Sequence, residues 1–284
     1  MSADPALFRS VLYIPGSRER AIEKSRGLEC DAIIFDLEDA VAPDEKDPAR
    51  QVLAEELAKG GFGSRYKLVR VNGQDTEWGA DDLAAVKEMD CDAVLVPKVD
   101  GAEVVDAVAQ SLAGLPIWCM MESPRGALNA LEIADHPSVQ GFVLGTNDLA
   151  KDLGCETGGD RMPMMTALQR CLMAARAAGI LCVDGVYNAF KDDAGLTEEC
   201  NQGLRLGMDG KSLIHPAQVA IANRIFAPTN AQIELAERQI EAFEQAQKRG
   251  EGVAVVDGRI VENLHIETAR KTLAKAHAIA ERAA

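Results

Sequence analysis

The hydrophobic and polar positions along the chain form short apolar runs that alternate with segments of helical character. The apolar runs are nearly continuous, which is typical of strands buried on both faces of a parallel sheet. We expect strands at 10–16, 32–39, 67–72, 93–98, 116–122, 141–144, 180–186 and 209–215. We expect helices at 17–24, with Ser17 as N-cap, and at 49–58, 80–89, 101–112, 162–178, 197–206 and 217–226.

Eight strands that alternate with helices are the pattern of a closed (β/α)₈ TIM barrel, an α/β fold, which we assign to residues 1–228. An open, doubly wound sheet is the alternative. A barrel would bring the polar residues that end the strands together on one face, where such folds carry their active sites. The strand ends therefore become the candidates for chemistry.

The pattern changes after the barrel, and we interpret residues 229–284 as a helical arm or lid that packs on a neighbouring subunit. A long charged helix is expected at 230–249, and a final helix begins at 264. Between them, two short apolar stretches flank Asp257-Gly258, a dipeptide that favours a tight turn between strands.

Composition narrows the class of protein. Among the 284 residues, 47% are hydrophobic and 26% charged, as in ordinary globular proteins. The net charge of −15 argues against a nucleic-acid partner. Seven scattered cysteines indicate reduced core thiols. We see neither a signal segment nor an apolar run long enough to cross a membrane, and so expect a cytoplasmic protein.

Glu122 and Asp148 each follow an apolar run, and the two runs are consecutive strands of the predicted barrel. Two carboxylates at neighbouring strand ends suit Mg²⁺, whose remaining positions are filled by water and substrate oxygens. Mn²⁺ takes the same ligands. The alternative is that each acid only caps the helix that follows it.

Glu38 and Asp39 end the second predicted strand, and Arg70 lies inside the third, apolar one. A buried arginine needs a partner, either a substrate carboxylate or the two acids. The acids are candidates for holding metal-bound water or orienting Arg70, or they form a solvated loop. Gly145 and Thr146 are candidates for presenting backbone N–H groups to a carboxylate.

Basic residues gather after the first, second and fourth strands and form a candidate anion cradle: Arg18, Arg20, Lys24, Lys46 and Lys98. Taken one by one, each also fits a solvated surface charge. His215 ends the last predicted strand and fits a packed, hydrogen-bonded histidine better than a catalytic one.

Seven ordered sequence blocks resemble the citrate lyase β-subunit-like branch of the HpcH/HpaI aldolase superfamily along nearly the whole chain. The blocks are RSVLYIPG at 9–16, DLEDAV at 36–41, RVN at 70–72, VPK at 96–98, ESPRG at 122–126, GTNDL at 145–149 and GKSLIHP at 210–216. The resemblance implies a Mg²⁺-dependent barrel that acts on acyl thioesters as a homotrimer or homohexamer. Coenzyme A (CoA) would then be part of the substrate.

The resemblance also implies roles for single residues. Glu122 and Asp148 match the metal ligands, and Arg70 matches the arginine that binds the substrate and stabilises an enolate. The CoA phosphates would be held by Lys24 and Lys46, with Phe8, Arg18 and Arg20 nearby.

The activity that the resemblance favours is cleavage or formation of the carbon–carbon bond of malyl-CoA, methylmalyl-CoA or citramalyl-CoA. Hydrolysis of the malyl-CoA thioester is one alternative, and a citrate lyase β subunit that works on an acyl-carrier protein is another. The lid of the CoA-dependent lyases carries an acid/base aspartate from a neighbouring subunit. Here Glu262 occupies that place, one methylene longer, and is a candidate for activating water.

Overall fold

The computed structural model describes residues 7–112, 114–156 and 159–283. Within them the chain forms two compact units. One is Phe8–Arg224, and the other consists of Leu7 and the residues from Ile225 onward.

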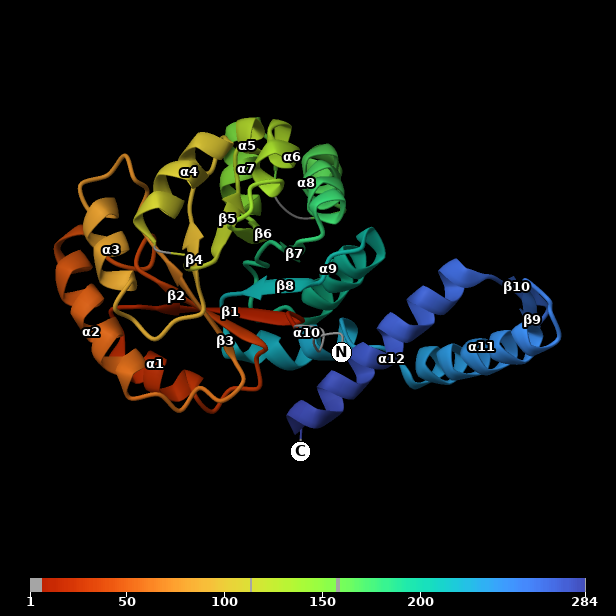
Figure 1. Ribbon diagram of the computed structural model, residues 1–284. Helices are drawn as coiled ribbons and strands as arrows, with labels where there is room; N and C mark the ends of the chain where they lie inside the picture. Colours follow the sequence, from red (N-terminus) through yellow and green to blue (C-terminus); the bar gives the residue numbers. More distant parts are fainter. Residues whose placement is uncertain (1–6, 113, 157–158, 284) are drawn as a thin grey trace. The chain divides into compact units, whose positions relative to one another are not determined.

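The larger unit is a closed barrel of eight parallel strands in sequence order, with β1 paired to β8 (Figure 1). The strands are β1 (Ser10–Pro15), β2 (Ala32–Asp36), β3 (Tyr66–Arg70), β4 (Ala93–Val96), β5 (Ile117–Met121), β6 (Val139–Leu144), β7 (Leu181–Asp184) and β8 (Gly210–Leu213). Every residue of β2, β4, β5 and β8 is buried. In β4 and β5 this agrees with continuous apolar runs, whereas β8 also buries Lys211 and Ser212. The predicted barrel is confirmed, and the open sheet is excluded.

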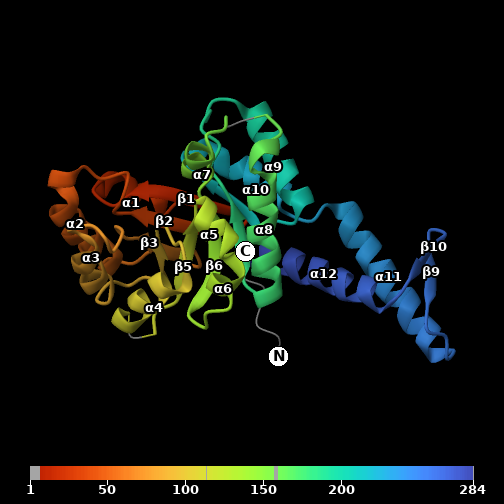
Figure 2. The same cartoon turned by 90° about the horizontal axis from the view of Figure 1, so that it is seen from above.

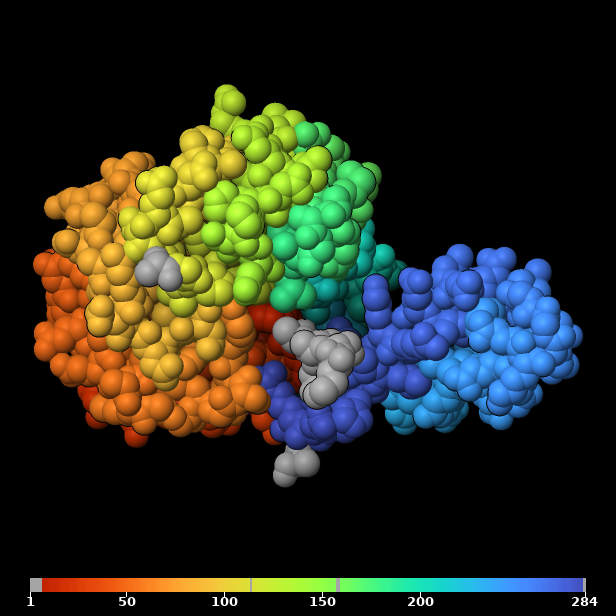
Figure 3. All heavy atoms as spheres, in the orientation of Figure 1, coloured from red at the N-terminus to blue at the C-terminus, as the bar shows by residue number. Residues whose placement is uncertain are grey.

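Helices surround the strands, as the view from above also shows (Figure 2). They are α1 (Glu19–Ser25), α2 (Lys46–Ala58), α3 (Gly79–Val86), α4 (Ala102–Ser111), α5 (Pro124–Leu128), α6 (Ala130–Ala134), α7 (Thr146–Leu153), α8 (Met165–Ala178), α9 (Asp193–Leu206) and α10 (Val219–Ile225). Short 3₁₀ turns precede three of them: η1 (Pro43–Glu45), η2 (Met162–Met164) and η3 (Pro216–Gln218). In the space-filling view the barrel unit follows the colour order from orange through yellow to green (Figure 3).

Two details of the helices differ from the sequence predictions. Helices α5, α6 and α7 were not predicted, because each has at most eight residues and a hydrophobic pattern over so few positions is a weak signal. The predicted N-cap of α1 is wrong: the helix is capped by Arg18 without a side-chain hydrogen bond, and Ser17 lies one residue before it.

The interior of the barrel is filled by apolar side chains, with Trp118 among the largest. A Cβ atom at Gly141 would come within 2.5 Å of the Trp118 ring, so only glycine leaves room for the indole there. Phe8 belongs to this core and is 3% exposed; its ring centroid lies 4.8 Å from that of Trp118 and 5.2 Å from that of Tyr66. Phe8 precedes β1, at the end of the barrel opposite the carboxyl ends of the strands. This position corrects the expectation that Phe8 contacts CoA.

The smaller unit contains α11 (Asn230–Lys248), β9 (Ala254–Val256), β10 (Arg259–Val261) and α12 (Asn263–Ala283). The two strands are antiparallel, and their turn is Asp257-Gly258, with φ of 50° and 73°. This confirms the predicted hairpin, since a two-residue turn of this kind needs positive φ at both positions. The core of the unit lies between the helices and the hairpin and includes Phe243, Val261 and Ile266. In the described parts of both units, no helix is long and apolar enough to cross a membrane.

Candidate active site

A cavity of about 340 Å³ opens at the carboxyl ends of the barrel strands. Six predicted site residues line it: Asp39, Arg70, Glu122, Gly145, Thr146 and Asp148. The sequence predictions had not assigned a site role to Tyr13, Asp36, Met120 and Ser212, which line it as well. Residues that are far apart in the chain therefore meet on the face that the barrel topology predicts.

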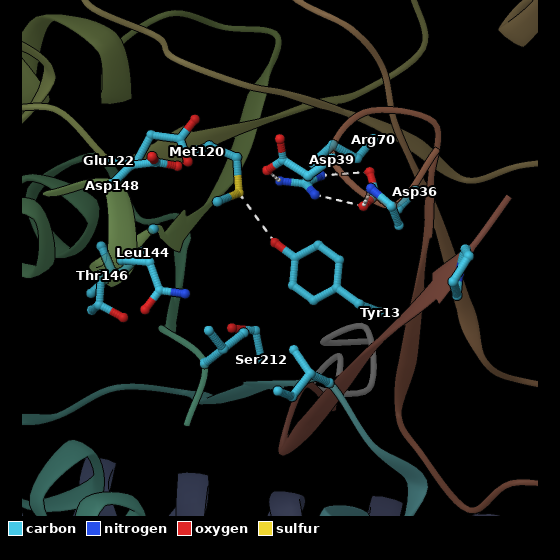
Figure 4. A pocket seen from close by; sticks show the side chains of 16 residues that line it. Tyr13, Asp36, Asp39, Arg70, Met120, Glu122, Leu144, Thr146, Asp148 and Ser212 are labelled. Atoms are coloured by element: carbon cyan, nitrogen blue, oxygen red, sulfur yellow. Dashed lines mark hydrogen bonds and ion pairs between the residues drawn. The ribbon is translucent and has the colours of Figure 1, made fainter. Parts of the chain in front are cut away.

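Glu122 and Asp148 lie side by side at one wall of the cavity (Figure 4). Glu122 directly follows β5, and Asp148 lies in the first turn of α7, which follows β6. The backbone N–H of Lys98 donates a 2.7 Å hydrogen bond to Glu122 Oε1 and holds the carboxylate in place. A Cβ atom at Gly145 would lie 2.4 Å from Glu122 Cβ, so glycine allows the β6–α7 turn to approach the acid this closely.

The surroundings of Glu122 favour binding of a cation. Burial is the largest of the effects that raise the pKa of Glu122 to about 7; the charges of Asp148 and Asp39 also raise it, and the Lys98 N–H and Arg70 oppose them. A divalent ion bound by the two carboxylates would stabilise the charged form of Glu122, which burial and the neighbouring acids disfavour. Among the described residues no group of three or more His, Cys, Asp or Glu forms a metal cluster. Two carboxylates are enough for Mg²⁺, which keeps several waters and binds substrate oxygens, so the residues present fit the expected ion.

Arg70 is paired with Asp36, a partner that the sequence predictions missed. Its Nε and Nη2 donate to the two Asp36 carboxylate oxygens at 2.7 and 2.6 Å. Its Nη1 lies 2.9 Å from Glu38 Oε2 and 3.4 Å from Asp39 Oδ2, so the two predicted acids do contact the guanidinium. The missing signal was the register of β2 on β3, which places Asp36 opposite Arg70.

Glu38 and Asp39 have different environments although they are neighbours in sequence. Burial is the largest of the effects that raise the pKa of Glu38 to about 7, and the charge of Asp39 is another. Arg70 lowers the pKa only in part, because it is shared among three acids. The side chain of Asp39 is 69% exposed and lines the cavity.

Tyr13 extends from β1 toward the centre of the cavity (Figure 4). Its hydroxyl donates to the Met120 sulfur at 3.3 Å, and the Arg70 guanidinium lies 5.0 Å from the ring centroid. Burial raises the pKa of Tyr13, so the phenol keeps its proton at neutral pH.

Behind the β6–α7 turn lies a second, fully buried group of charges. Asp184 accepts hydrogen bonds from Arg161 Nη1 at 2.8 and 3.0 Å, and Lys211 Nζ donates to Glu199 at 2.6 Å. Two acids and two bases balance one another. A Cβ atom at Gly185, next to Asp184, would lie 2.4 Å from Thr146 Oγ1, so this group supports the turn that carries the site.

The residues of the predicted basic cradle are partly exposed and partly buried in the structure. Arg18, Arg20 and Lys24 are exposed at α1, and the Lys98 side chain is 65% exposed. Lys46 is buried instead: its three N–H groups donate to Leu37 O, Glu38 O and Asn72 Oδ1 at 2.6–2.8 Å. In this structure Lys46 fastens the loop that carries Glu38, and a role in CoA binding stays a prediction.

Two further candidates lie outside the cavity. His215 is exposed, stacks on Phe190 and accepts a hydrogen bond from Ala217 N–H at 3.2 Å, as a hydrogen-bonded cap of η3. The hydrogen bond agrees with the non-catalytic alternative, but the expected packing does not, because the residue is exposed. Glu262 lies in the smaller unit, where its exposed side chain follows β10 and its backbone carbonyl begins α12.

Known proteins resemble this chain along most of its length. The sequence pattern of the HpcH/HpaI aldolase/citrate lyase family matches residues 9–216. A (3S)-malyl-CoA thioesterase of Cereibacter sphaeroides (strain KD131 / KCTC 12085) is 62% identical over 96% of both chains. The citrate lyase subunit beta of Escherichia coli (strain K12) is 36% identical over 94% of this chain and 93% of its own length.

A solved structure covers nearly the whole chain as well. The CitE protein of Mycobacterium tuberculosis, crystallised with magnesium, acetoacetate and coenzyme A, superposes with a TM-score of 0.82 at 27% identity. The match covers 97% of this chain and 100% of that one.

These relatives correct the main functional expectation drawn from the sequence. A carbon–carbon lyase was expected first, with thioester hydrolysis as the alternative. Relatives that are 60–62% identical over 96% of the chain are thioesterases, so the expectation of a lyase is wrong and the alternative is favoured.

Proposed function

The chain belongs to the HpcH/HpaI aldolase/citrate lyase family and is an enzyme that acts on CoA thioesters; from this premise we propose that it hydrolyses (3S)-malyl-CoA to malate and CoA. The observation that carries the proposal is the 62% identity to a (3S)-malyl-CoA thioesterase along 96% of both chains. The cavity supports it, since it combines a carboxylate pair with an arginine.

The chemistry of the substrate matches the two charged walls of the cavity. Malyl-CoA carries a carboxylate and a hydroxyl at the end remote from sulfur. Arg70 faces this end with a guanidinium that Asp36 holds rigidly, so little freedom is lost when the substrate binds. Glu122 and Asp148 would hold Mg²⁺, which supplies Lewis-acid charge toward the substrate oxygens.

Contacts with neighbouring residues hold the Glu122 carboxylate and the Glu38–Asp39 loop in fixed positions. Lys98 N–H and the close contact of Gly145 fix the Glu122 side chain. Lys46 fastens the loop of Glu38 and Asp39. These contacts are in place before substrate arrives.

Hydrolysis also needs a group that takes a proton from water, and we assign it to Glu262. The side chain of Glu262 is exposed, so its carboxylate is accessible to water. We further propose that the protein is a homotrimer or homohexamer in which the smaller unit of one subunit completes the site of another. Exposed apolar side chains on that unit support this, namely Val255, Ile260 and Leu264.

Product analysis tests the proposed function. Purified protein is incubated with (3S)-malyl-CoA and Mg²⁺, and free thiol, malate and glyoxylate are followed separately. Thiol and malate in equal amounts without glyoxylate support hydrolysis. Glyoxylate without thiol would contradict it.

A further inference from the structure

The hydroxyl group of Tyr13 points into the space between the charged walls of the cavity (Figure 4). Glu122 and Asp148 lie on one side of it, and Arg70 with its acids on the other. The Arg70 guanidinium lies over one face of the Tyr13 ring, 5.0 Å from the ring centroid, and helps to fix the ring. The hydroxyl is therefore aimed at the volume that a substrate anchored at both walls would fill.

The present partner of this hydroxyl is a weak one. Tyr13 donates to the Met120 thioether sulfur at 3.3 Å, and a thioether is a poor acceptor. Other donors of the cavity wall are better satisfied: Arg70 by carboxylates and Ser212 by the backbone carbonyl of Asp184 at 2.9 Å. Exchanging the sulfur for a substrate oxygen would cost the Tyr13 hydroxyl little.

We propose that Tyr13 is a catalytic residue whose hydroxyl donates a hydrogen bond to the thioester carbonyl oxygen during hydrolysis. This inference rests on the proposed function. Water adds to the carbonyl carbon, forming the new C–O bond, and the π electrons move onto the carbonyl oxygen. The Tyr13 O–H stabilises the charge on that oxygen without giving up its proton.

The product of water addition then breaks down to malate and CoA. When the carbonyl forms again, the C–S bond breaks and its electron pair leaves with the CoA sulfur. One proton of the water ends on the thiol and the other is released to solvent, leaving the malate carboxylate. A donor fixed in advance at the charge that develops is the arrangement that lowers such barriers most.

The test compares Tyr13→Phe with Tyr66→Phe. Each variant removes one phenolic hydroxyl and keeps the ring, but of the two hydroxyls only that of Tyr13 points into the cavity. Removal of one such donor lowers kcat by about 10²–10³-fold. We expect this loss in Tyr13→Phe with KM unchanged within about threefold, because the interaction strengthens in the transition state. Tyr66 is not among the residues that line the cavity, and its hydroxyl donates to Gln140 Oε1 at 3.1 Å, so Tyr66→Phe should keep kcat within about threefold.

Substrate-analogue binding is measured separately, to exclude that the substitution acts by changing the shape of the cavity. The ketone analogue of malyl-CoA, with CH₂ in place of sulfur, should bind both variants as it binds the wild type, within about threefold, in calorimetry with Mg²⁺. Thermal unfolding of both variants reports their folding.

The outcomes separate this inference from the proposed function. A slow Tyr13→Phe beside a normal Tyr66→Phe supports it. A Tyr13→Phe variant with wild-type kcat, or an equal loss in both variants, overturns it while hydrolysis by the wild type stands. Absence of thiol release by the wild-type protein overturns the proposed function itself, and the role of Tyr13 with it.

Discussion

Asp36 and Arg70 form a bidentate ion pair across neighbouring strands, with N–O distances of 2.7 and 2.6 Å, beside the cavity of the barrel. Both side chains are buried. Asp36 also accepts hydrogen bonds from the backbone N–H groups of Glu38 and Ala40. One carboxylate therefore fixes both the guanidinium and the loop that carries two more acids.

Substitution of Asp36 by Asn should destabilise the protein and weaken substrate binding. Removing one partner of a buried ion pair costs about 3–5 kcal/mol, because the other charge stays buried without compensation. Asp39→Asn is the control, since its exposed carboxylate should contribute at most about 1 kcal/mol. Urea unfolding of both variants measures the difference, and equal midpoints would contradict the assigned role of Asp36.

Glu122→Gln should abolish binding of the divalent ion. The amide keeps the shape of the side chain but offers no charge to Mg²⁺. Calorimetric titration with Mg²⁺ or Mn²⁺ should lose its signal, and Mg²⁺-dependent thiol release should disappear. Glu55→Gln, at an exposed position of α2, serves as the control with wild-type behaviour. Full activity of Glu122→Gln would overturn the metal assignment.

Gly145→Ala should weaken metal binding, whereas Gly154→Ala should lower only stability. Gly145 has φ of −92°, so alanine is not strained there, but its Cβ would push the Glu122 side chain away. We expect at least about a tenfold loss of Mg²⁺ affinity, within the range for disturbed ligand support. Gly154 has φ of 66° and no atom within 4 Å, so alanine there should cost about 1 kcal/mol of stability and leave metal binding unchanged.

The titration of Glu38 should make stability depend on pH. Burial raises the pKa of Glu38 from 4.5 to about 7. Between these values the folded state binds more protons than the unfolded state, so the free energy of unfolding falls as pH rises. The full difference is about 3 kcal/mol. In metal-free protein, Tm should decline from pH 5 to 8 more steeply in the wild type than in Glu38→Gln, and parallel curves would contradict the shift.

A shared active site predicts complementation between two inactive variants. Glu122→Gln lacks the metal site, and Glu262→Gln lacks the proposed base on the smaller unit. If one subunit supplies Glu262 to another, co-expressed subunits should assemble some sites that contain both native residues and recover activity. Absence of recovery in an oligomer shown by light scattering to contain both variants would contradict the shared site.

The sequence predicted the barrel and the acid pair because both depend on short-range signals. Continuous apolar runs locate the strands, and acids that lie at or shortly after the ends of two neighbouring strands meet once the barrel closes. The pairing of Asp36 with Arg70 depends on strand register, which no local pattern reports. Tyr13 was missed for a similar reason, since its role as a cavity residue depends on which face of β1 points inward. Phe8 was assigned to the site but belongs to the core, which only its packing against Trp118 reveals.

Oxygen-isotope labelling tests the central claim most directly. The reaction of (3S)-malyl-CoA is run in H₂¹⁸O with Mg²⁺, and the malate is analysed by mass spectrometry. Hydrolysis predicts one ¹⁸O atom in the carboxyl group that was the thioester carbonyl, together with free CoA. Conversion of the substrate to glyoxylate and acetyl-CoA, without labelled malate, would contradict it.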